Sequence, residues 1–167
     1  MKKTVFLTGA TGTMGYAGMT EILRYPEKYH LRILARPSKK NKEKLAPLAD
    51  KVEVIWGDLT KYEDILRGVT GADIVLHVGG MVSPQADYRP KATLRTNISA
   101  ATNIRDAVLA QPEDKQPKVV YIGSVAQMGD RREPLHWGPL LCEKGARSLN
   151  NQLTSIETSV DTLANYV

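Results

Sequence analysis

Three glycines follow the first apolar stretch of the chain at three-residue intervals, in the run TGATGTMG over residues 8–15. They are Gly9, Gly12 and Gly15, and the residues after them are typical of a helix. Glycine lets a phosphate approach the backbone without a Cβ in the way, and the free amides of a helix N-terminus attract its charge. The order of strand, glycines and helix therefore favours a dinucleotide-binding loop over a purely structural turn. Residues 9–15 are called the glycine loop below.

The rest of the chain alternates strand-like and helix-like stretches, which are the elements that must hold this loop. Strands are expected over residues 3–9, 30–36, 51–58, 72–80 and 118–124. Helices are expected over residues 13–25, 40–50, 61–69 and 92–111. This alternation predicts an α/β fold, a Rossmann-type doubly wound parallel sheet with strand order 3-2-1-4-5. In such a sheet, ligands bind at the carboxyl ends of the strands, near the switch between strands 1 and 4.

A basic stretch after the second expected strand bears on which dinucleotide would bind. Residues 36–44, RPSKKNKEK, carry five basic residues and one acid. An acidic residue usually holds the ribose 2′-hydroxyl at this place, but the sequence has Arg36 there, with Lys39 and Lys40 close behind. A guanidinium forms paired, charge-assisted hydrogen bonds with a phosphate, so the stretch favours NADP, with NAD as the alternative. A solvated basic loop without a ligand is the other interpretation.

Four further motifs occur in the order typical of one family. The glycine loop resembles the TGxxGxxG loop of extended short-chain dehydrogenases/reductases, the NAD-dependent epimerase/dehydratase family. WGDL (56–59) resembles the adenine-contacting segment of that family, and LHVGG (76–80) resembles its HxA(A/G) segment. RTNISAATNI (95–104) resembles its asparagine-containing helix, and VVYIGSVAQMGD (119–130) resembles its xVYxSSxxVYG segment. The resemblance covers roughly the first 130 residues.

The resemblance implies a role for each matching position. It implies dinucleotide contacts from Gly9, Thr11, Gly12, Thr13, Met14, Gly15, Asp58, Leu59, Val78, Gly79, Gly80 and Asn97. Ser124 matches the active-site serine, although it could be a turn residue. Asp58 could instead cap the helix expected over 61–69, and Asn97 could bond helix backbone. For His77, a packed histidine at a strand end is favoured over a catalytic one.

The proton-transfer pair of the family is missing from this sequence. In the family a tyrosine transfers the proton, and a lysine four residues later lowers the pKa of that tyrosine. The chain has seven tyrosines, and none has a lysine four positions on. The resemblance fades after residue 138, so we expect a fold truncated relative to the family, without a separate substrate domain. A truncated chain and a tail of another origin, such as a frameshift, both fit this pattern.

Two segments are therefore expected. Residues 1–130 form an NAD(P)-binding domain, and residues 131–167 form an atypical C-terminal segment. Within the latter, residues 148–167 place apolar side chains at intervals of three and four, which predicts an amphipathic helix. The apolar stripe could pack on the sheet or on a second copy. A homodimer is expected from this stripe and from the pairing typical of the family.

Composition narrows the remaining classes. With 42% hydrophobic and 25% charged residues, the chain is typical of a soluble globular protein. No apolar run approaches the roughly 20 residues of a membrane span, and the first run is too short for a signal peptide, so we expect a cytoplasmic location and no membrane. The single cysteine, Cys142, and the spacing of the three histidines give no metal site. Despite the net charge of +5, no aromatic residues interleave with the basic stretch, so no nucleic-acid partner is expected.

Two versions of the function remain. In one, the chain is the NAD(P)-binding part of an epimerase/dehydratase or reductase that acts on a sugar-nucleotide, or on a ketone or alcohol. In the other, it is a dinucleotide-binding scaffold without catalysis, or an inactive fragment. The missing tyrosine–lysine pair counts against turnover by this chain, while the cofactor motifs fit both versions.

Overall fold

The computed structural model describes residues 2–123, which form a parallel five-stranded sheet with the order β3-β2-β1-β4-β5. This order confirms the predicted Rossmann topology. The strands are β1 (Lys3–Thr8), β2 (Tyr29–Ala35), β3 (Glu53–Trp56), β4 (Ile74–His77) and β5 (Lys118–Tyr121). The helices are α1 (Thr13–Ile22), α2 (Lys39–Leu45), α3 (Tyr62–Val69), α4 (Gln85–Tyr88) and α5 (Pro90–Leu109). Ser124 and the helix predicted over 148–167 lie outside the described residues.

The predicted element types are confirmed, but some boundaries were wrong. The helix predicted over 40–50 ends at Leu45 and continues only as a 3-10 turn over Ala46–Leu48. Pro47, inside that turn, has no amide proton to continue α-helical bonding. The helix predicted over 92–111 starts earlier, at Pro90, because proline suits the first turn of a helix. Helix α4 was missed because four residues are too few to show a periodicity.

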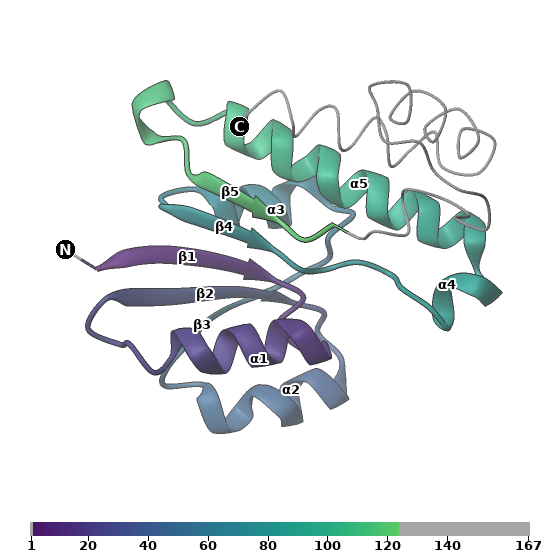
Figure 1. Ribbon diagram of the computed structural model, residues 1–167, viewed down its shortest axis with the longest axis horizontal. Coiled ribbons are helices and arrows are strands. Elements are labelled where there is room, and N and C mark those ends of the chain that lie inside the picture. The colour runs from purple at the N-terminus through teal and green to yellow at the C-terminus, as the bar shows by residue number, and fades with distance from the viewer. Residues whose placement is uncertain (1, 124–167) are drawn as a thin grey trace, which may run out of the picture. The chain divides into compact units, whose positions relative to one another are not determined.

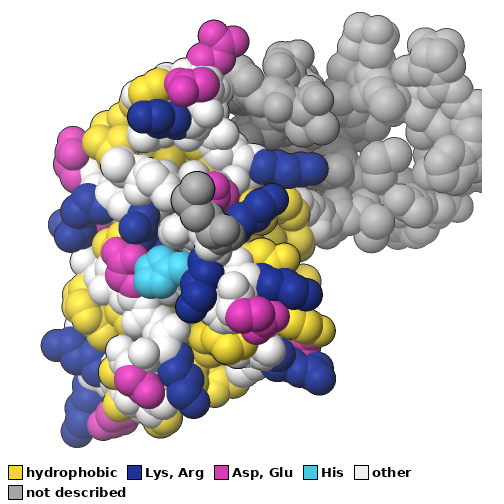
Figure 2. Space-filling view, turned by 90° about the vertical axis from the view of Figure 1, so that its left-hand side faces the viewer, with side chains coloured by type: hydrophobic (Ala, Val, Ile, Leu, Met, Phe, Trp, Pro, Cys, Tyr) yellow, Lys and Arg dark blue, Asp and Glu magenta, His cyan; other side chains and the backbone are white. Residues whose placement is uncertain are grey.

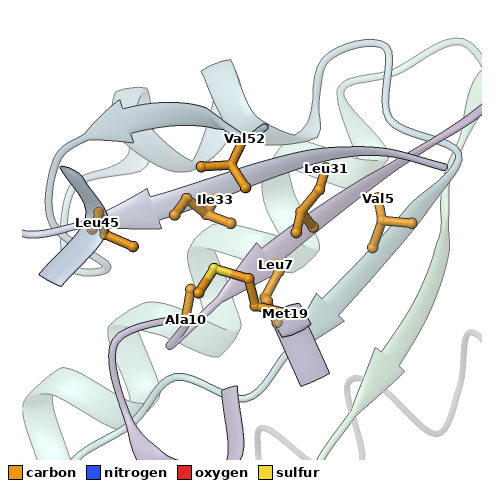
Figure 3. Close-up of a cluster of buried hydrophobic side chains, with 9 residues drawn as sticks. Val5, Leu7, Ala10, Met19, Leu31, Ile33, Leu45 and Val52 are labelled. Atoms are coloured by element: carbon orange, nitrogen blue, oxygen red, sulfur yellow. The ribbon is translucent and has the colours of Figure 1, made fainter. Parts of the chain in front are cut away.

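One face of the sheet packs against α1 and α2. Figure 3 shows Leu7 from β1 and Ile33 from β2 directed toward the side chains that these helices supply. Met19 from α1 and Leu45 from α2 are both almost fully buried there. Each large apolar side chain buried in this way contributes about 1.5–3 kcal/mol. The cluster therefore fixes α1 and α2 over the sheet at the ends of the strands they follow.

The other face packs against α3 and α5, as Figure 1 shows. Phe6 stands between Val5 and Leu7 in the sequence of β1, and these two residues face the first cluster. Because side chains alternate along a strand, Phe6 points to the second face. Ile65 from α3 and Ile104 from α5 cover it, and both are almost fully buried. Burial on both faces explains why the strands read as continuous apolar runs. This packing also fixes the positions of the carboxyl ends of the strands. The predicted site residues follow directly after these ends.

Candidate functional site

Two glycines of the glycine loop are required by the fold itself. Gly9 has φ +76°, and a Cβ there would lie 2.7 Å from the backbone of Gly79. A Cβ on Gly15 would lie 2.1 Å from the carbonyl oxygen of Gly9. Both positions therefore need glycine whether or not a ligand binds, since β1, α1 and the segment after β4 meet here.

Gly12 is different, because little of the protein surrounds it. Among residues 2–123, and apart from its chain neighbours, a Cβ there would have only the Gly9 carbonyl oxygen within 4 Å, at 3.3 Å. The Gly12 amide donates to that same oxygen at 2.9 Å, which closes the turn. This one contact is tight, but a shift of a few tenths of an ångström in the loop would relieve it, so Gly12 is less constrained by packing than Gly9 and Gly15. Gly12 stands directly before the first turn of α1, where free amides attract a phosphate.

The N-terminus of α1 has the properties of an anion site. Gly12 is the N-cap residue and supplies no side-chain cap, and the first turn holds no acidic residue. The first backbone bond into the helix runs from the Tyr16 amide to the Gly12 carbonyl at 2.9 Å. The amides of Thr13, Met14 and Gly15 precede that bond, so they stand at the positive end of the helix dipole. The predicted residues of the glycine loop are thus brought together around these amides.

Asp58 lies next to the end of β2, because the Gly57 amide donates to the Ala35 carbonyl at 3.0 Å. Its carboxylate accepts bonds from the Thr60 amide (2.8 Å) and the Thr60 hydroxyl (2.7 Å). Partial burial alone would raise the pKa of Asp58, but these bonds and the charges of Arg36 and Lys61 lower it below its usual value. The N-cap residue of α3 is Lys61. The alternative that Asp58 caps this helix was therefore wrong.

Arg36 is brought to the same edge as Asp58. Its carbonyl accepts bonds from the Asn41 side-chain amide at 2.9 Å and from the Ser38 amide at 2.8 Å, so the turn into α2 is well fixed. The guanidinium of Arg36 is exposed and acts on the Asp58 carboxylate through its charge. Lys39 is more peripheral, with a side chain 92% exposed and 3.9 Å from Glu43.

Two residues that the sequence analysis missed fix the backbone around Asp58. The Asp64 carboxylate, on α3, accepts a bond from the Asp58 amide at 2.9 Å. A Cβ on Gly57 would lie 2.5 Å from this carboxylate, so the close approach depends on glycine. The Asn103 side chain, on α5, donates to the Leu59 carbonyl at 2.9 Å. Asn103 lies inside the motif of residues 95–104, so that motif was the signal that could have identified it.

The segment after β4 is held by a buried hydrogen-bonded chain. The Gly79 amide donates to the Thr8 hydroxyl oxygen at 3.1 Å. That hydroxyl lies 2.6 Å from Nδ1 of His77. The hydroxyl proton can therefore be donated to Nδ1, which leaves the imidazole neutral with its proton on Nε2. Burial lowers the pKa of His77 to about 4. This geometry supports the predicted packed role of His77, and Thr8 is a further residue that the sequence analysis missed.

Asn97 clamps the next part of the same segment. Its side-chain oxygen accepts a bond from the Met81 amide at 2.8 Å, and its side-chain nitrogen donates to the Met81 carbonyl at 3.1 Å. Both bonds go to the segment after β4, so the alternative of a bond to helix backbone was wrong. Val78, Gly79 and Gly80 are thereby held between Thr8 and Asn97, beside Gly9. These three predicted residues therefore lie beside the glycine loop, on the same edge of the sheet.

Two absences can be stated for the described part of the chain. Residues 2–123 contain no group of three His, Cys, Asp or Glu side chains placed to hold a metal ion. Across the same residues, none of the helices is both long enough and apolar enough to cross a membrane. The site on this edge is therefore built from backbone amides, glycines and a few charged side chains.

Comparisons with known proteins match most of the chain. The profile of the family described as NAD dependent epimerase/dehydratase matches residues 5–141. The UDP-glucose 4-epimerases of Rickettsia akari and Rickettsia bellii are 27% and 28% identical to the chain over 127 residues. These alignments cover 73% of this chain and 36% of each relative. The chain thus spans little more than a third of the length of these curated relatives.

Solved structures give the same result. Pen from Bacillus thuringiensis matches with a TM-score of 0.57 and 28% identity, covering 66% of this chain and 36% of that one. The UDP-Glc/GlcNAc 4-epimerase from Campylobacter jejuni matches with a TM-score of 0.66, covering 92% of this chain and 50% of that one. At 15% identity, the second match shows the fold alone.

Proposed function

Because the chain belongs to the NAD dependent epimerase/dehydratase family, we propose that its described part binds a nicotinamide dinucleotide at the carboxyl edge of the sheet. The glycine loop receives the pyrophosphate on the amides of residues 13–15. The observation that carries this proposal is the open surroundings of Gly12, where a Cβ would have one atom of the described residues within 4 Å besides its chain neighbours. A glycine with largely open surroundings, before a helix without a side-chain cap, is what a phosphate site requires.

We further propose that the dinucleotide is NADP, with NAD as the weaker ligand. Arg36 replaces the acidic residue that usually holds a ribose 2′-hydroxyl. Its guanidinium is exposed at the end of β2, where paired hydrogen bonds to a 2′-phosphate are feasible. In this arrangement, Asp58 and Leu59 line the site of the adenine. Lys39 adds charge at the margin of this site.

The reaction proposed for the whole protein is hydride transfer between nicotinamide and a substrate carbon bearing oxygen. The names of the relatives suggest a sugar-nucleotide as substrate, since several are UDP-glucose 4-epimerases. A ketone or alcohol is the alternative substrate class. Ser124 is the one active-site residue proposed from this chain, and it lies outside the described residues. A homodimer is proposed from the apolar stripe over 148–167.

The second candidate function is a dinucleotide-binding scaffold that does not turn over. The specific observation in its favour is that no tyrosine of this sequence has a lysine four positions on. A positive charge one helical turn away is what makes a phenolate accessible near neutral pH. Cofactor binding without conversion of UDP-glucose would favour the scaffold, and conversion would exclude it.

Equilibrium binding of NADPH and NADH to the full chain tests the proposal. We expect Gly12→Val to weaken both ligands at least a hundredfold, because its side chain occupies the phosphate space. Gly18→Val is the matched control, since a Cβ at Gly18 on the same helix meets nothing within 4 Å. Arg36→Glu should reverse the preference toward NADH. A folded wild-type chain that binds neither nucleotide would contradict the proposed function.

A further inference from the structure

The last lysine of the basic stretch over residues 36–44 reaches the glycine loop from α2. The Lys44 ammonium donates a hydrogen bond to the Thr11 carbonyl oxygen at 2.9 Å. The same ammonium lies 4.4 Å from the centroid of the Tyr16 ring, a distance suited to a cation–π contact. Thr11 lies within the glycine loop and Tyr16 on the first turns of α1. One charge therefore contacts the segments on both sides of the Gly12 turn.

Lys44 differs from the other lysines of α2 in its surroundings. Lys39, Lys40 and Lys42 are exposed, whereas Lys44 is half-buried and bonded to backbone. The next residue, Leu45, is 2% exposed and packs in the cluster between the sheet, α1 and α2. Because Leu45 anchors the end of α2, the reach of Lys44 to Thr11 is fixed by the fold. This arrangement is unlike that of a solvated surface lysine, which explores many rotamers.

We propose that Lys44 is a positioning residue for the pyrophosphate of the dinucleotide, an inference that rests on the proposed function. A carbonyl oxygen carries partial negative charge, so one directed at the phosphates would repel them. The bond from Lys44 draws the Thr11 carbonyl toward α2 and leaves the amide side of the turn facing the phosphates. The ammonium also adds a full positive charge in a half-buried place, where charges are screened less than at an exposed one.

Two substitutions at Lys44 separate this role from general packing. Lys44→Met keeps much of the side-chain length but removes the charge and the donor, whereas Lys44→Arg keeps both. Lys115→Met is the control, because Lys115 is an exposed lysine just before β5, at the opposite edge of the sheet. All four full-length proteins are titrated with NADPH, NADH and adenosine 2′-monophosphate, which has no pyrophosphate.

We expect Lys44→Met to raise the Kd of NADPH and NADH about tenfold, equivalent to about 1.4 kcal/mol. The Kd of adenosine 2′-monophosphate should change less than twofold. Lys44→Arg should keep the Kd of both dinucleotides within about threefold of wild type. Lys115→Met should leave every Kd unchanged within twofold. An equal loss for the dinucleotides and for adenosine 2′-monophosphate would overturn the proposal, as would identical behaviour of Lys44→Met and Lys115→Met.

Amide hydrogen exchange of the ligand-free proteins gives an arm that needs no cofactor. Lys44→Met should speed exchange in the glycine loop while leaving the strands protected, and Lys44→Arg should not. Unchanged exchange in Lys44→Met would overturn the positioning role. If the wild-type chain bound no dinucleotide, the proposed function would fail. Faster amide exchange in the glycine loop of Lys44→Met would then still show that Lys44 holds this loop in place.

Discussion

The two edges of the sheet use polar side chains in different ways. At the carboxyl edge, side chains bond to the backbone of the loops that follow the strands, through Thr8, Asp64, Asn97 and Asn103. At the amino edge, which Figure 2 views directly, side chains of both charges are interspersed over the surface. There Glu53 accepts a bond from His30 at 2.9 Å and lies 2.9 Å from the Arg32 guanidinium.

We call the carboxyl edge the shaped edge, because side chains there fix the backbone of the loops. The amino edge is the solvated edge, because its side chains pair with one another near solvent. Arg32 also donates to the carbonyls of Gly68 (3.0 Å) and Thr70 (2.8 Å), so it satisfies the end of α3 rather than a loop that could hold a ligand. Pairs between half-exposed side chains contribute only about 0–1 kcal/mol. A buried bond to loop backbone costs more to remove, because it leaves a polar group unpaired. Substitutions at the two edges should therefore differ in both stability and ligand binding.

The largest effect is expected at Gly15, in the carboxyl edge. Gly15→Ala places a Cβ 2.1 Å from the Gly9 carbonyl oxygen, a backbone atom that cannot rotate away as a side chain can. We expect a loss of about 3 kcal/mol or more in the free energy of unfolding, at or beyond the upper range for overpacking. Urea unfolding measures it. Gly18→Ala on the same helix, where a Cβ would meet no neighbouring element of the described residues within 4 Å, should instead gain about 0.5–1 kcal/mol.

The second effect is a pH dependence that belongs to His77. Burial lowers its pKa from 6.5 to about 4 in the folded protein. The unfolded chain therefore binds more protons between these values, so stability is full above pH 6.5 and falls as the pH drops toward 4. The shift corresponds to about 3 kcal/mol in total.

Unfolding free energies measured between pH 7 and pH 4 test this effect. His77→Gln should be less stable at pH 7 but should flatten the fall over this range. His30→Gln, at the amino edge, should keep the fall because His77 is still present. If His77→Gln retained the full wild-type slope, the dependence would have to come from other groups.

A third effect distinguishes binding from stability at Asn97. Asn97→Ala removes both bonds to Met81, so the segment after β4 loses its clamp. We expect a loss of about 1–2 kcal/mol in stability and a rise of about tenfold in the Kd of NADPH. The control is Gln111→Ala, since Gln111 donates to the Ala107 carbonyl at the far end of the same helix. An unchanged Kd in Asn97→Ala would show that this clamp does not shape the ligand site.

The contrast between the edges also explains what the sequence could predict. The glycine loop and the strand order were predictable because their signals are local spacings and the alternation of strands and helices, whereas the segment of Asp58 was singled out by its resemblance to the family. The partners of Thr8, Asn103 and Lys44 lie 71, 44 and 33 residues away along the chain. A side chain whose role depends on a crossover between layers carries no local pattern. The contacts of Thr8 and Lys44 therefore became visible only in the fold, and the motif over 95–104 contained Asn103 without indicating its partner.

The smallest effect is expected at Glu53, in the amino edge. Burial would raise the pKa of Glu53, but its bonds and charge contacts with His30 and Arg32 lower it below 4.5. Its stabilising contribution is therefore present above pH 4.5 and lost as the pH falls below that value, a lower window than that of His77. Because the Glu53 side chain is 43% exposed, solvent screens the pair and Glu53→Gln should cost no more than about 1 kcal/mol at pH 7.

The Kd of NADPH for Glu53→Gln should not change, since no loop of the carboxyl edge depends on this carboxylate. A rise in that Kd as large as that of Asn97→Ala would mean that the two edges are coupled through β2 and β3, and the separation of a shaped edge from a solvated one would fail.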